Sequence, residues 1–274
     1  SYSIPSWANV HLYPSGEADE EIQRLKATNS KLRFQERYGG VPSPPSGSVY
    51  ADDVRPDHIT AAAEYHSGQP VQLWIDPGST GAYAVLAVHV MSGHVDVFDE
   101  IYERGKTNAE IISIARQRPW GRPLPTYAVI DRAGQQHHME RSATDAWFAA
   151  GVRLSWRLVR VVDGIDRVKA LLRGTPDSGQ PFLRINPRCQ GLLSEMGHAA
   201  GPFDNSGPYL YKLDNTNTPM SDVPDQTKNN HACAALAYGL VDNFGYVTRP
   251  RSDGPTSWWG NQGTYWWPTA QDNN

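Results

Sequence analysis

The sequence predicts an α/β protein with a mixed sheet, in which three antiparallel strands come first and parallel strands follow, flanked by helices. Three observations support this prediction. Apolar runs rich in β-branched residues follow one another between residues 71 and 105, separated only by short polar turns, as in consecutive antiparallel strands. From residue 107 to residue 189, helix-like and strand-like segments alternate, as in parallel sheets joined by helical crossovers. Residues 229 to 246 then carry apolar side chains at helical spacing, which predicts a closing helix.

The region before the predicted sheet, residues 1 to 70, is expected to be an N-terminal arm or linker with one helix. Residues 18 to 38 begin with acidic side chains, continue with apolar ones at near-helical spacing and stop at two glycines, which is typical of an amphipathic surface helix. The segment VPSPPSG at residues 41 to 47 contains three prolines and a glycine. These residues forbid regular structure and indicate a linker or a wrapped arm.

The predicted sheet opens with a β-hairpin. VQLWID at residues 71 to 76 and AYAVLAVHVM at residues 82 to 91 are apolar runs joined by the turn PGSTG. HVDVFDEIYERG at residues 94 to 105 adds a third strand with alternating apolar side chains. Thr107 has the residue type of a helix N-cap and precedes several isoleucines, so a helix follows the three strands.

The rest of the domain, up to residue 247, alternates strands and helices, and a tail follows it. We expect strands at residues 126 to 131, 153 to 162 and 181 to 189, and helices at residues 142 to 151 and 164 to 174. The tail, residues 248 to 274, is polar and rich in glycine and proline, yet it carries four tryptophans. Tryptophans in such a segment either pack on the domain or await a partner. The four are Trp258, Trp259, Trp266 and Trp267.

The composition of the chain indicates a folded domain and excludes several classes of protein. Of its 274 residues, 39% are hydrophobic and 10% aromatic, which argues against acidic disorder. The net charge of −4 argues against a protein that holds nucleic acid by bulk electrostatics alone. Two cysteines, Cys189 and Cys233, are too few for a structural zinc site, and we expect both in the core of a protein from a reducing compartment. No apolar stretch approaches the roughly 20 residues of a membrane span, so we expect no membrane association.

Two aspartates, Asp76 and Asp131, each end an apolar strand. At the carboxyl ends of neighbouring strands of an α/β sheet, two carboxylates can come close enough to share divalent cations. Such cations, Mg²⁺ for example, prefer oxygen ligands and keep several waters, so two or three carboxylates suffice. The alternative for each aspartate alone is a turn residue, because aspartate is common in turns.

A second interpretation concerns DPGSTG at residues 76 to 81. This segment is similar to the first phosphate loop of the actin-like sugar kinases, in which backbone amides bind phosphate. Those kinases need two lobes and a second glycine-rich aspartate loop, and no such loop is present in the sequence.

Taken in order, the segments of residues 5 to 245 resemble one family, the large terminase subunit of tailed bacteriophages. The resemblance is to its C-terminal nuclease domain, which has a ribonuclease H-like fold, and to the segment that joins this domain to the family's packaging ATPase. The joining segment is represented by PSWANVHLYPSGEADEEIQRLK and FQERYGGVPSPPSGSVYADD. The nuclease domain is represented by WIDPGSTGAYAVL, VIDRAGQQHHMERSATDAWFAAGV, GIDRVKALLR, FLRINPRCQGLLSEM and NNHACAALAYGL.

The resemblance implies an endonuclease that cuts concatemeric viral double-stranded DNA into genome lengths with two Mg²⁺ or Mn²⁺ ions. Asp76 would bridge the two ions, and Asp131 would bind one of them. It also implies double-stranded DNA, the small terminase subunit and the portal protein as partners, and a location in the host cell cytoplasm at the procapsid. The chain contains no GxxxxGK[ST] motif, so it has no visible ATP site of its own.

The chain departs from the family at the third metal carboxylate, which normally opens the last helix. Asn230 stands there, and Ala234 stands where a further acid is often found. Asparagine offers one neutral oxygen, so the affinity for the second ion should fall, unless Asp225 or Asp222 in the preceding loop replaces the carboxylate. A plain helix N-cap is the other interpretation of Asn230. The departure leaves open an engineered change, natural drift to weak activity, or a DNA-binding or motor-docking module without catalysis. A ribonuclease H-like junction resolvase would share the chemistry but would not explain the N-terminal segment.

Residues 141 to 190 hold nine Lys and Arg against four Asp, a local excess of 9 − 4 = +5. This stretch could follow a DNA backbone or could be ordinary solvated surface. We expect Arg132, Arg157 and Lys169 to contact DNA. His137 and His138 could touch a metal or a phosphate, or lie in an exposed loop.

Overall fold

A computed structural model of the chain describes most residues up to Val247. They are residues 4–28, 34, 38–40, 47–78, 81–131, 142–174, 179–203, 206–216, 218–225, 227 and 230–247. Contacts divide the chain into two units, Ser1–Ser46 and Gly47–Asn274. The N-terminal region predicted from the sequence extends to residue 70, but the second unit already begins at Gly47. Val49, Tyr50 and Val54 are buried in the core of this second unit. The tail from residue 248 lies outside the described residues.

The first unit contains two short 3-10 helices, η1 (Ser6–Ala8) and η2 (Gly16–Ala18), and the helix α1 (Glu20–Thr28). Acidic side chains in the first turn of α1 and Lys26 in its last turn match the helix dipole. Ile22 is fully buried, and the ring of Trp7 stacks on Phe34 with centroids 5.7 Å apart. The helix expected over residues 18 to 38 is thus present from Glu20 to Thr28, and most of its second half lies outside the described residues.

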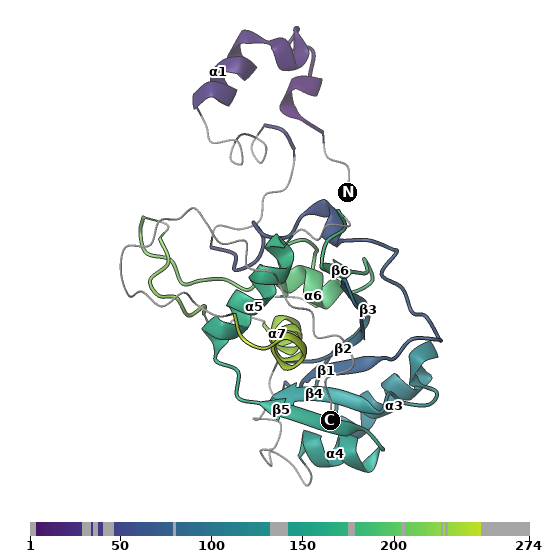
Figure 1. Cartoon of the computed structure of the whole chain (residues 1–274). Helices are drawn as coiled ribbons and strands as arrows, with labels where there is room; N and C mark the ends of the chain where they lie inside the picture. The colour runs from purple at the N-terminus through teal and green to yellow at the C-terminus, as the bar shows by residue number, and fades with distance from the viewer. Residues whose placement is uncertain are drawn as a thin grey trace. The chain divides into compact units, whose positions relative to one another are not determined.

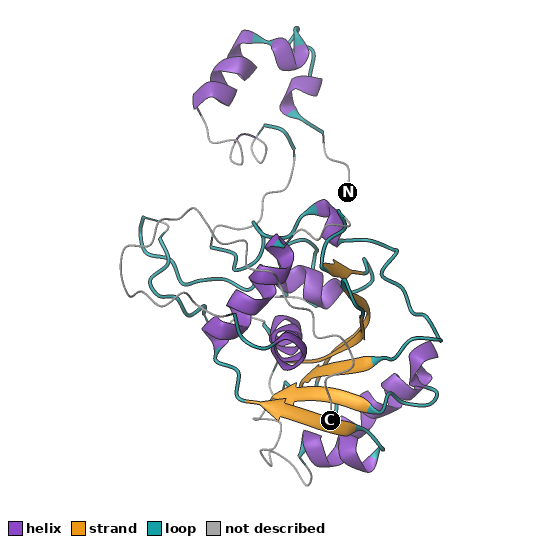
Figure 2. Cartoon of the chain, in the orientation of Figure 1, coloured by secondary structure: helices purple, strands orange, loops and turns teal. Residues whose placement is uncertain are grey.

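The second unit is built on a six-stranded sheet of order β5-β4-β1-β2-β3-β6. The pairs β1–β2 and β2–β3 are antiparallel, and β1–β4, β4–β5 and β3–β6 are parallel. This confirms the predicted mixed sheet, with three antiparallel strands first and parallel strands later (Figures 1 and 2). The strands are β1 (Gln72–Asp76), β2 (Ala82–Val90), β3 (Val95–Arg104), β4 (Tyr127–Asp131), β5 (Arg153–Arg157) and β6 (Leu183–Ile185).

Helices connect and cover these strands, and several begin where the sequence predicts. Thr107 caps the helix after β3, because its side chain accepts from the Glu110 backbone N–H while Glu110 reaches back to the Thr107 N–H. Gly151 follows the helix after β4 with φ of +95°, a conformation that favours glycine. The helical elements are η3 (Pro56–His58), α3 (Asn108–Gln117), η4 (Pro119–Gly121), α4 (Ala143–Ala149), α5 (Val161–Arg173), α6 (Gln190–Glu195) and α7 (His231–Phe244).

Two predicted strands are shorter than the sequence suggested. The strand expected over residues 153 to 162 is confined to β5, and its last two valines already belong to α5. Arg160 is the N-cap of α5 and its Nε lies 2.6 Å from Oδ2 of Asp163, so a local ion pair supports a helix start where β-branched residues favoured a strand. The strand expected over residues 181 to 189 is confined to β6, since Pro187 has no N–H for a sheet ladder.

The sheet has a hydrophobic core on each face. Trp74 and Val129 belong to the core beneath α5, α6 and α7, whereas Ile75 and Ile130 belong to the core that faces α3 and α4. Figure 1 shows α5 and α7 on one side of the sheet and α3 and α4 on the other. Close approach of α7 to the sheet requires Gly239, because a Cβ there would lie 1.8 Å from Cδ2 of Trp74. This packing fixes α7 above β1 and β4.

No helix in the described part of the chain is both long and apolar enough to cross a membrane.

Candidate active site

Asp76 and Asp131 lie side by side at one edge of the sheet. They are the last residues of β1 and β4, which are parallel neighbours with Ile75 paired to Ile130, so each aspartate stands one residue beyond that pair. Strand alternation places both carboxylates on the face of Trp74, which α7 covers. Both residues are partly buried. The structure therefore brings together the two aspartates that the sequence singled out.

The first residue of α7, His231, contacts Asp76 directly. Nδ1 of His231 lies 2.7 Å from Oδ2 of Asp76. A carboxylate only accepts, so Nδ1 carries the proton in this contact. Burial lowers the pKa of His231, but the hydrogen bond and the charge of Asp76 outweigh burial, and the net pKa is raised. His231 stands inside the NNHACAALAYGL segment, yet sequence reasoning gave it no role.

Gly78 and Gly81, on either side of the undescribed residues after β1, lie against this imidazole. A Cβ at Gly81 would lie 2.0 Å from Nε2 of His231, and a Cβ at Gly78 would lie 3.2 Å from its Cε1. The glycines of the DPGSTG turn thus have a packing role, since any larger residue at position 81 would displace the ring. This packing explains the glycines without the phosphate loop that the second interpretation of this segment proposes. Ser79 and Thr80 lie outside the described residues.

Tyr238, two turns further along α7, belongs to the same site. Burial raises its pKa strongly, and the negative charges of Asp76 and Asp131 raise it further. Tyr238 was not predicted as a site residue, although helical spacing puts it on the face of Asn230 and Ala234.

Asn230 is the N-cap residue of α7, but its side chain makes no capping hydrogen bond. Asn230 therefore occupies the N-cap position, as the N-cap interpretation predicts, but its side chain does not form the capping hydrogen bond that this interpretation implies. Asn230, Ala234 and Tyr238 line a cavity of about 60 Å³ between α5 and α7. Asn230 and Tyr238 thus border the same cavity.

A buried carboxylate caps α7 in place of Asn230. Glu195, the last residue of α6, is 1% exposed. Its Oε2 accepts a hydrogen bond of 2.8 Å from the backbone N–H of Cys233, and its Oε1 accepts one of 2.7 Å from the hydroxyl of Tyr102. Burial raises the pKa of Glu195, and the hydrogen bonds oppose that rise.

Asp225, expected as a substitute metal ligand, has one oxygen engaged in a local turn. Its Oδ1 accepts hydrogen bonds from the Thr227 backbone N–H, at 3.0 Å, and from the Thr227 hydroxyl, at 2.7 Å. Asp222, the other candidate, is exposed. Among the residues that the structure describes, no group of three or more His, Cys, Asp or Glu side chains is arranged to hold a metal ion. The sheet itself brings two carboxylates, those of Asp76 and Asp131, to this edge.

Of the three residues predicted to contact DNA, the structure describes only the side chain of Lys169. Arg132 and the two histidines at 137 and 138 lie outside the described residues, as does the side chain of Arg157. Lys169 is 3.7 Å from the carboxylate of Asp53, which Arg173 also contacts, so its charge is partly neutralised within the protein.

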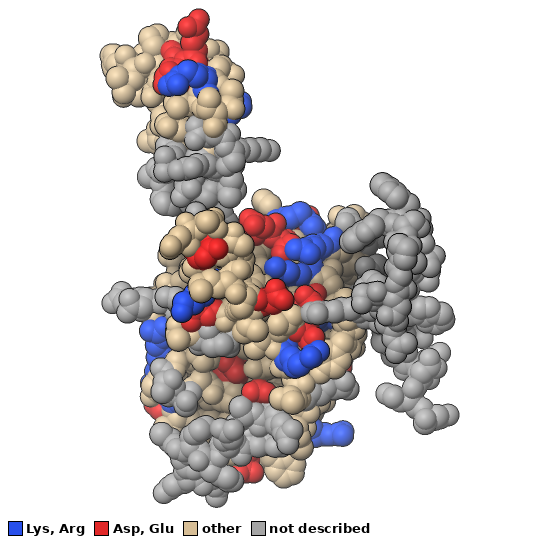
Figure 3. All heavy atoms as spheres, turned by 90° about the vertical axis from the view of Figure 1, so that its left-hand side faces the viewer, with Lys and Arg blue, Asp and Glu red and all other residues tan. Residues whose placement is uncertain are grey.

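Ion pairs engage other basic residues of the 141–190 stretch. Arg160 pairs with Asp163, and Arg184 pairs with Asp96. On the face drawn in Figure 3, positive and negative side chains of the described residues are interspersed. Two carboxylates from outside the stretch, Asp53 and Asp96, pair with its basic side chains, so the local excess of positive charge is partly compensated in the fold.

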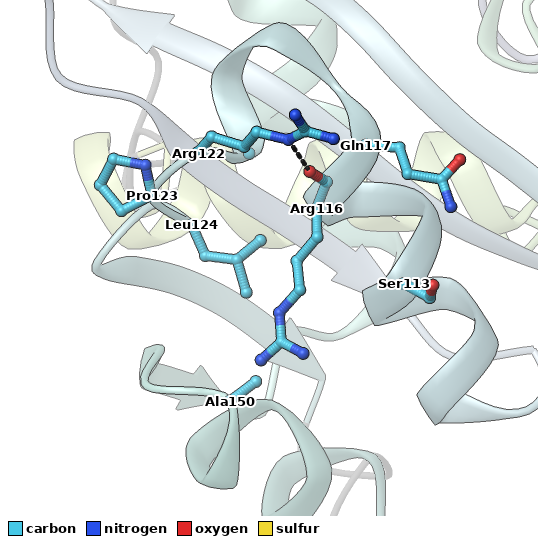
Figure 4. A pocket seen from close by; sticks show the side chains of 8 residues that line it. Ser113, Arg116, Gln117, Arg122, Pro123, Leu124 and Ala150 are labelled. Carbon is cyan, nitrogen blue, oxygen red and sulfur yellow. Dashed lines mark hydrogen bonds between the residues drawn. The ribbon is translucent and has the colours of Figure 1, made fainter.

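A separate hollow of about 450 Å³ lies beside the end of α3 (Figure 4). Arg116 and Arg122 line it, and Nε of Arg122 donates to the backbone carbonyl of Arg116 at 3.0 Å. In Figure 4 the Arg116 side chain points toward Ala150, away from the Arg122 guanidinium. Leu124, which also lines the hollow, precedes the beginning of β4, at the end away from Asp131. The hollow is thus distinct from the carboxylate site.

Comparison with solved structures identifies proteins of similar fold. No family model matches the sequence, and no curated protein does. The large terminase from a thermophilic bacteriophage matches with a TM-score of 0.53 and 14% identity over 84% of this chain and 54% of that one in crystal form 3. In crystal form 2 the same terminase matches with a TM-score of 0.55 and 15% identity over 81% and 51%. The large terminase nuclease domain from bacteriophage SPP1, solved with bound Mn, matches with a TM-score of 0.45 and 14% identity over 67% and 91%.

At these identities the likeness concerns the fold. The chain is similar in fold to part of a large terminase, which confirms the resemblance found in the sequence at the level of structure. It spans about half the length of the large terminases that it matches.

Proposed function

We propose that this chain is the metal-dependent endonuclease domain of a viral DNA-packaging terminase. The observation that carries the proposal is the placement of Asp76 and Asp131 at the ends of paired parallel strands, beneath the N-terminus of α7. The likeness in fold to a phage large terminase supports the same assignment. The substrate in this proposal is concatemeric double-stranded DNA, cut into genome lengths by phosphodiester hydrolysis.

The donor set fits a hard divalent cation such as Mg²⁺ or Mn²⁺. Asp76 and Asp131 supply carboxylate oxygens, Asn230 supplies a neutral amide oxygen, and such cations accept few protein ligands because they retain waters. Asn230 is the N-cap residue of α7, directly before His231, which contacts Asp76. Once bound, two ions would activate a water and stabilise the leaving oxygen of the scissile phosphate.

Two further residues, His231 and Tyr238, support the carboxylates in binding the cation and the phosphate. His231 donates to Oδ2 of Asp76 and thereby orients the carboxylate. A proton donor held against a ligating carboxylate fixes its geometry and tunes its basicity. Tyr238 adds a phenol, kept protonated by burial and by both aspartates, which can donate to a phosphate oxygen.

The setting proposed for this domain follows from the same family. We propose that it acts in the host cell cytoplasm at the procapsid, with the small terminase subunit and the portal protein as partners. The paired basic side chains and the net charge of −4 suit a domain that receives DNA from such a motor, because it would hold DNA weakly alone.

One observation favours a second candidate, a DNA-binding or motor-docking module with weakened catalysis. Asn230 provides no charge at the position where the family has a carboxylate. A site with two carboxylates binds a second cation less tightly than a site with three. The two candidates differ in whether the chain cuts DNA.

Incubation of supercoiled plasmid with Mn²⁺ or Mg²⁺ tests the proposal. We expect nicked and linear products with little sequence preference, loss of cleavage in D76N and D131N, and faster cleavage in N230D. D57N serves as the matched control, since Asp57 is exposed and belongs to η3, outside the site. Absence of cleavage even in N230D, with salt-dependent DNA binding intact, would favour the module without catalysis.

A further inference from the structure

Two buried glutamates hold consecutive helices of the second unit in place. Glu100 of β3 accepts hydrogen bonds from the backbone N–H groups of Gly191 and Leu192 at 2.5 and 3.0 Å, at the start of α6. Glu195 ends α6 and accepts from the N–H of Cys233, at the start of α7. Each carboxylate thus stabilises the positive end of a helix that has no side-chain cap of its own.

Hydrogen bonds from Tyr102 and from the α7 backbone hold the Glu195 carboxylate in place. Oε1 accepts from the Tyr102 hydroxyl and Oε2 from the α7 backbone, so both carboxylate oxygens are used. The Tyr102 ring is itself held against α6, because a Cβ at Gly191 would lie 2.4 Å from its Cγ. A fully buried carboxylate with both oxygens engaged is a rigid anchor, since moving it would leave a buried charge without partners.

The anchored turn of α7 carries the site's histidine. Cys233 lies two residues after His231, whose Nδ1 contacts Asp76 at 2.7 Å. A shift of the first turn of α7 would therefore move the imidazole away from Asp76.

We infer that Glu195 is a positioning residue of the carboxylate site: through the first turn of α7 it sets the contact between His231 and Asp76. That this contact matters for catalysis rests on the proposed function. That Glu195 sets the contact does not depend on the proposed function. Glu195 touches neither aspartate; its effect passes through the α7 backbone.

The substitution Glu195→Gln tests the inference, because it keeps the size of the side chain and removes its charge. The matched control is D99N. Asp99 is also a buried carboxylate, 5% exposed, and its Oδ2 accepts from Trp120 at 2.7 Å, on the side of the sheet away from α7. Thermal unfolding of both variants measures the general loss of stability that any such change produces.

The decisive readout is the imidazole proton on Nδ1 of His231 in the NMR spectrum, assigned by its absence in H231N. We expect E195Q to shift or abolish this signal, while D99N leaves it unchanged. Should E195Q fail to fold, Y102F removes the side-chain hydrogen bond to Glu195 and is expected to shift the signal in the same direction. An unchanged His231 signal in the folded Glu195 or Tyr102 variant overturns the inference.

Mn²⁺ calorimetry separates this inference from the proposed function. If the wild-type chain binds Mn²⁺, we expect E195Q to weaken binding by about tenfold, the lower end of the effect of residues that support ligands indirectly. If the wild-type chain binds no Mn²⁺, the proposed function fails, while the His231 signal still decides the role of Glu195.

Discussion

Nδ1 of His231 lies 2.7 Å from Oδ2 of Asp76 and joins the start of α7 to the end of β1. This contact spans 155 positions of the sequence and brings the closing helix onto the edge of the sheet where both strand-ending aspartates stand. It makes the candidate site a product of three elements: β1, β4 and α7.

The imidazole is predicted to support the function of Asp76. In H231A the carboxylate loses its hydrogen-bond donor, so we expect plasmid cleavage to fall by about 10- to 100-fold, the range typical of groups that orient metal ligands. Initial rates of plasmid linearisation in Mn²⁺ measure the effect. H11A is the control, since His11 lies in the first unit. Equal rates for H231A and the wild type would contradict the role of the contact.

The glycine at position 81 is predicted to be required for the same contact. In G81A the new methyl group would meet Nε2 of His231, so the ring or the loop must move; we expect a loss of about 1–3 kcal/mol in unfolding free energy, as for overpacking elsewhere. G93A is the matched control, because a Cβ at Gly93 meets nothing within 4 Å. Chemical denaturation and cleavage assays measure both variants. A G81A protein as stable and active as G93A would refute the packing.

Glu100 is predicted to make stability depend on pH. Burial raises its pKa from 4.5 to about 7, despite the lowering effect of the hydrogen bonds from Gly191 and Leu192. A carboxyl group whose pKa is higher in the folded state stabilises the fold fully below pH 4.5, and this contribution is lost as the pH rises through about 7.

The test compares the unfolding free energy of the wild type with that of E100Q across this range. Relative to E100Q, the wild type should lose about 3 kcal/mol between pH 4.5 and pH 7 and change little above it. Denaturant titrations at several pH values give the difference. A constant difference across the range would show that the Glu100 pKa is not raised.

Much of the fold could be predicted because its signals are local. Apolar runs and turn residues located the opening strands, and Thr107 located a helix start. The two aspartates could be paired in advance, since the carboxyl ends of neighbouring parallel strands share one edge of a sheet. The strand expected up to residue 162 was predicted too long, because α5 already begins at Val161. An ion pair between Arg160 and Asp163 supports this helix start, and β propensity does not reveal it.

The rest of the site depends on contacts that the sequence does not display. A histidine at the start of an apolar helix gives no local sign that it reaches an aspartate far away in the chain. Glu195 resembles any polar residue near a helix end, and only the fold shows that it is buried and caps another helix. Asn230 has the residue type of a cap, and only the structure shows that its side chain makes no capping bond.

The central claim is that Asp76 and Asp131 together hold a divalent cation. Calorimetric titration of the chain with Mn²⁺ tests it most directly, with D76N, D131N and the control D57N measured in parallel. We predict binding in the wild type and D57N, at least about tenfold weaker binding in each site variant, and tighter binding in N230D, since a carboxylate there adds a charged ligand. Mn²⁺ binding that is equal in the wild type, D76N and D131N, or absent even in N230D, would contradict the claim.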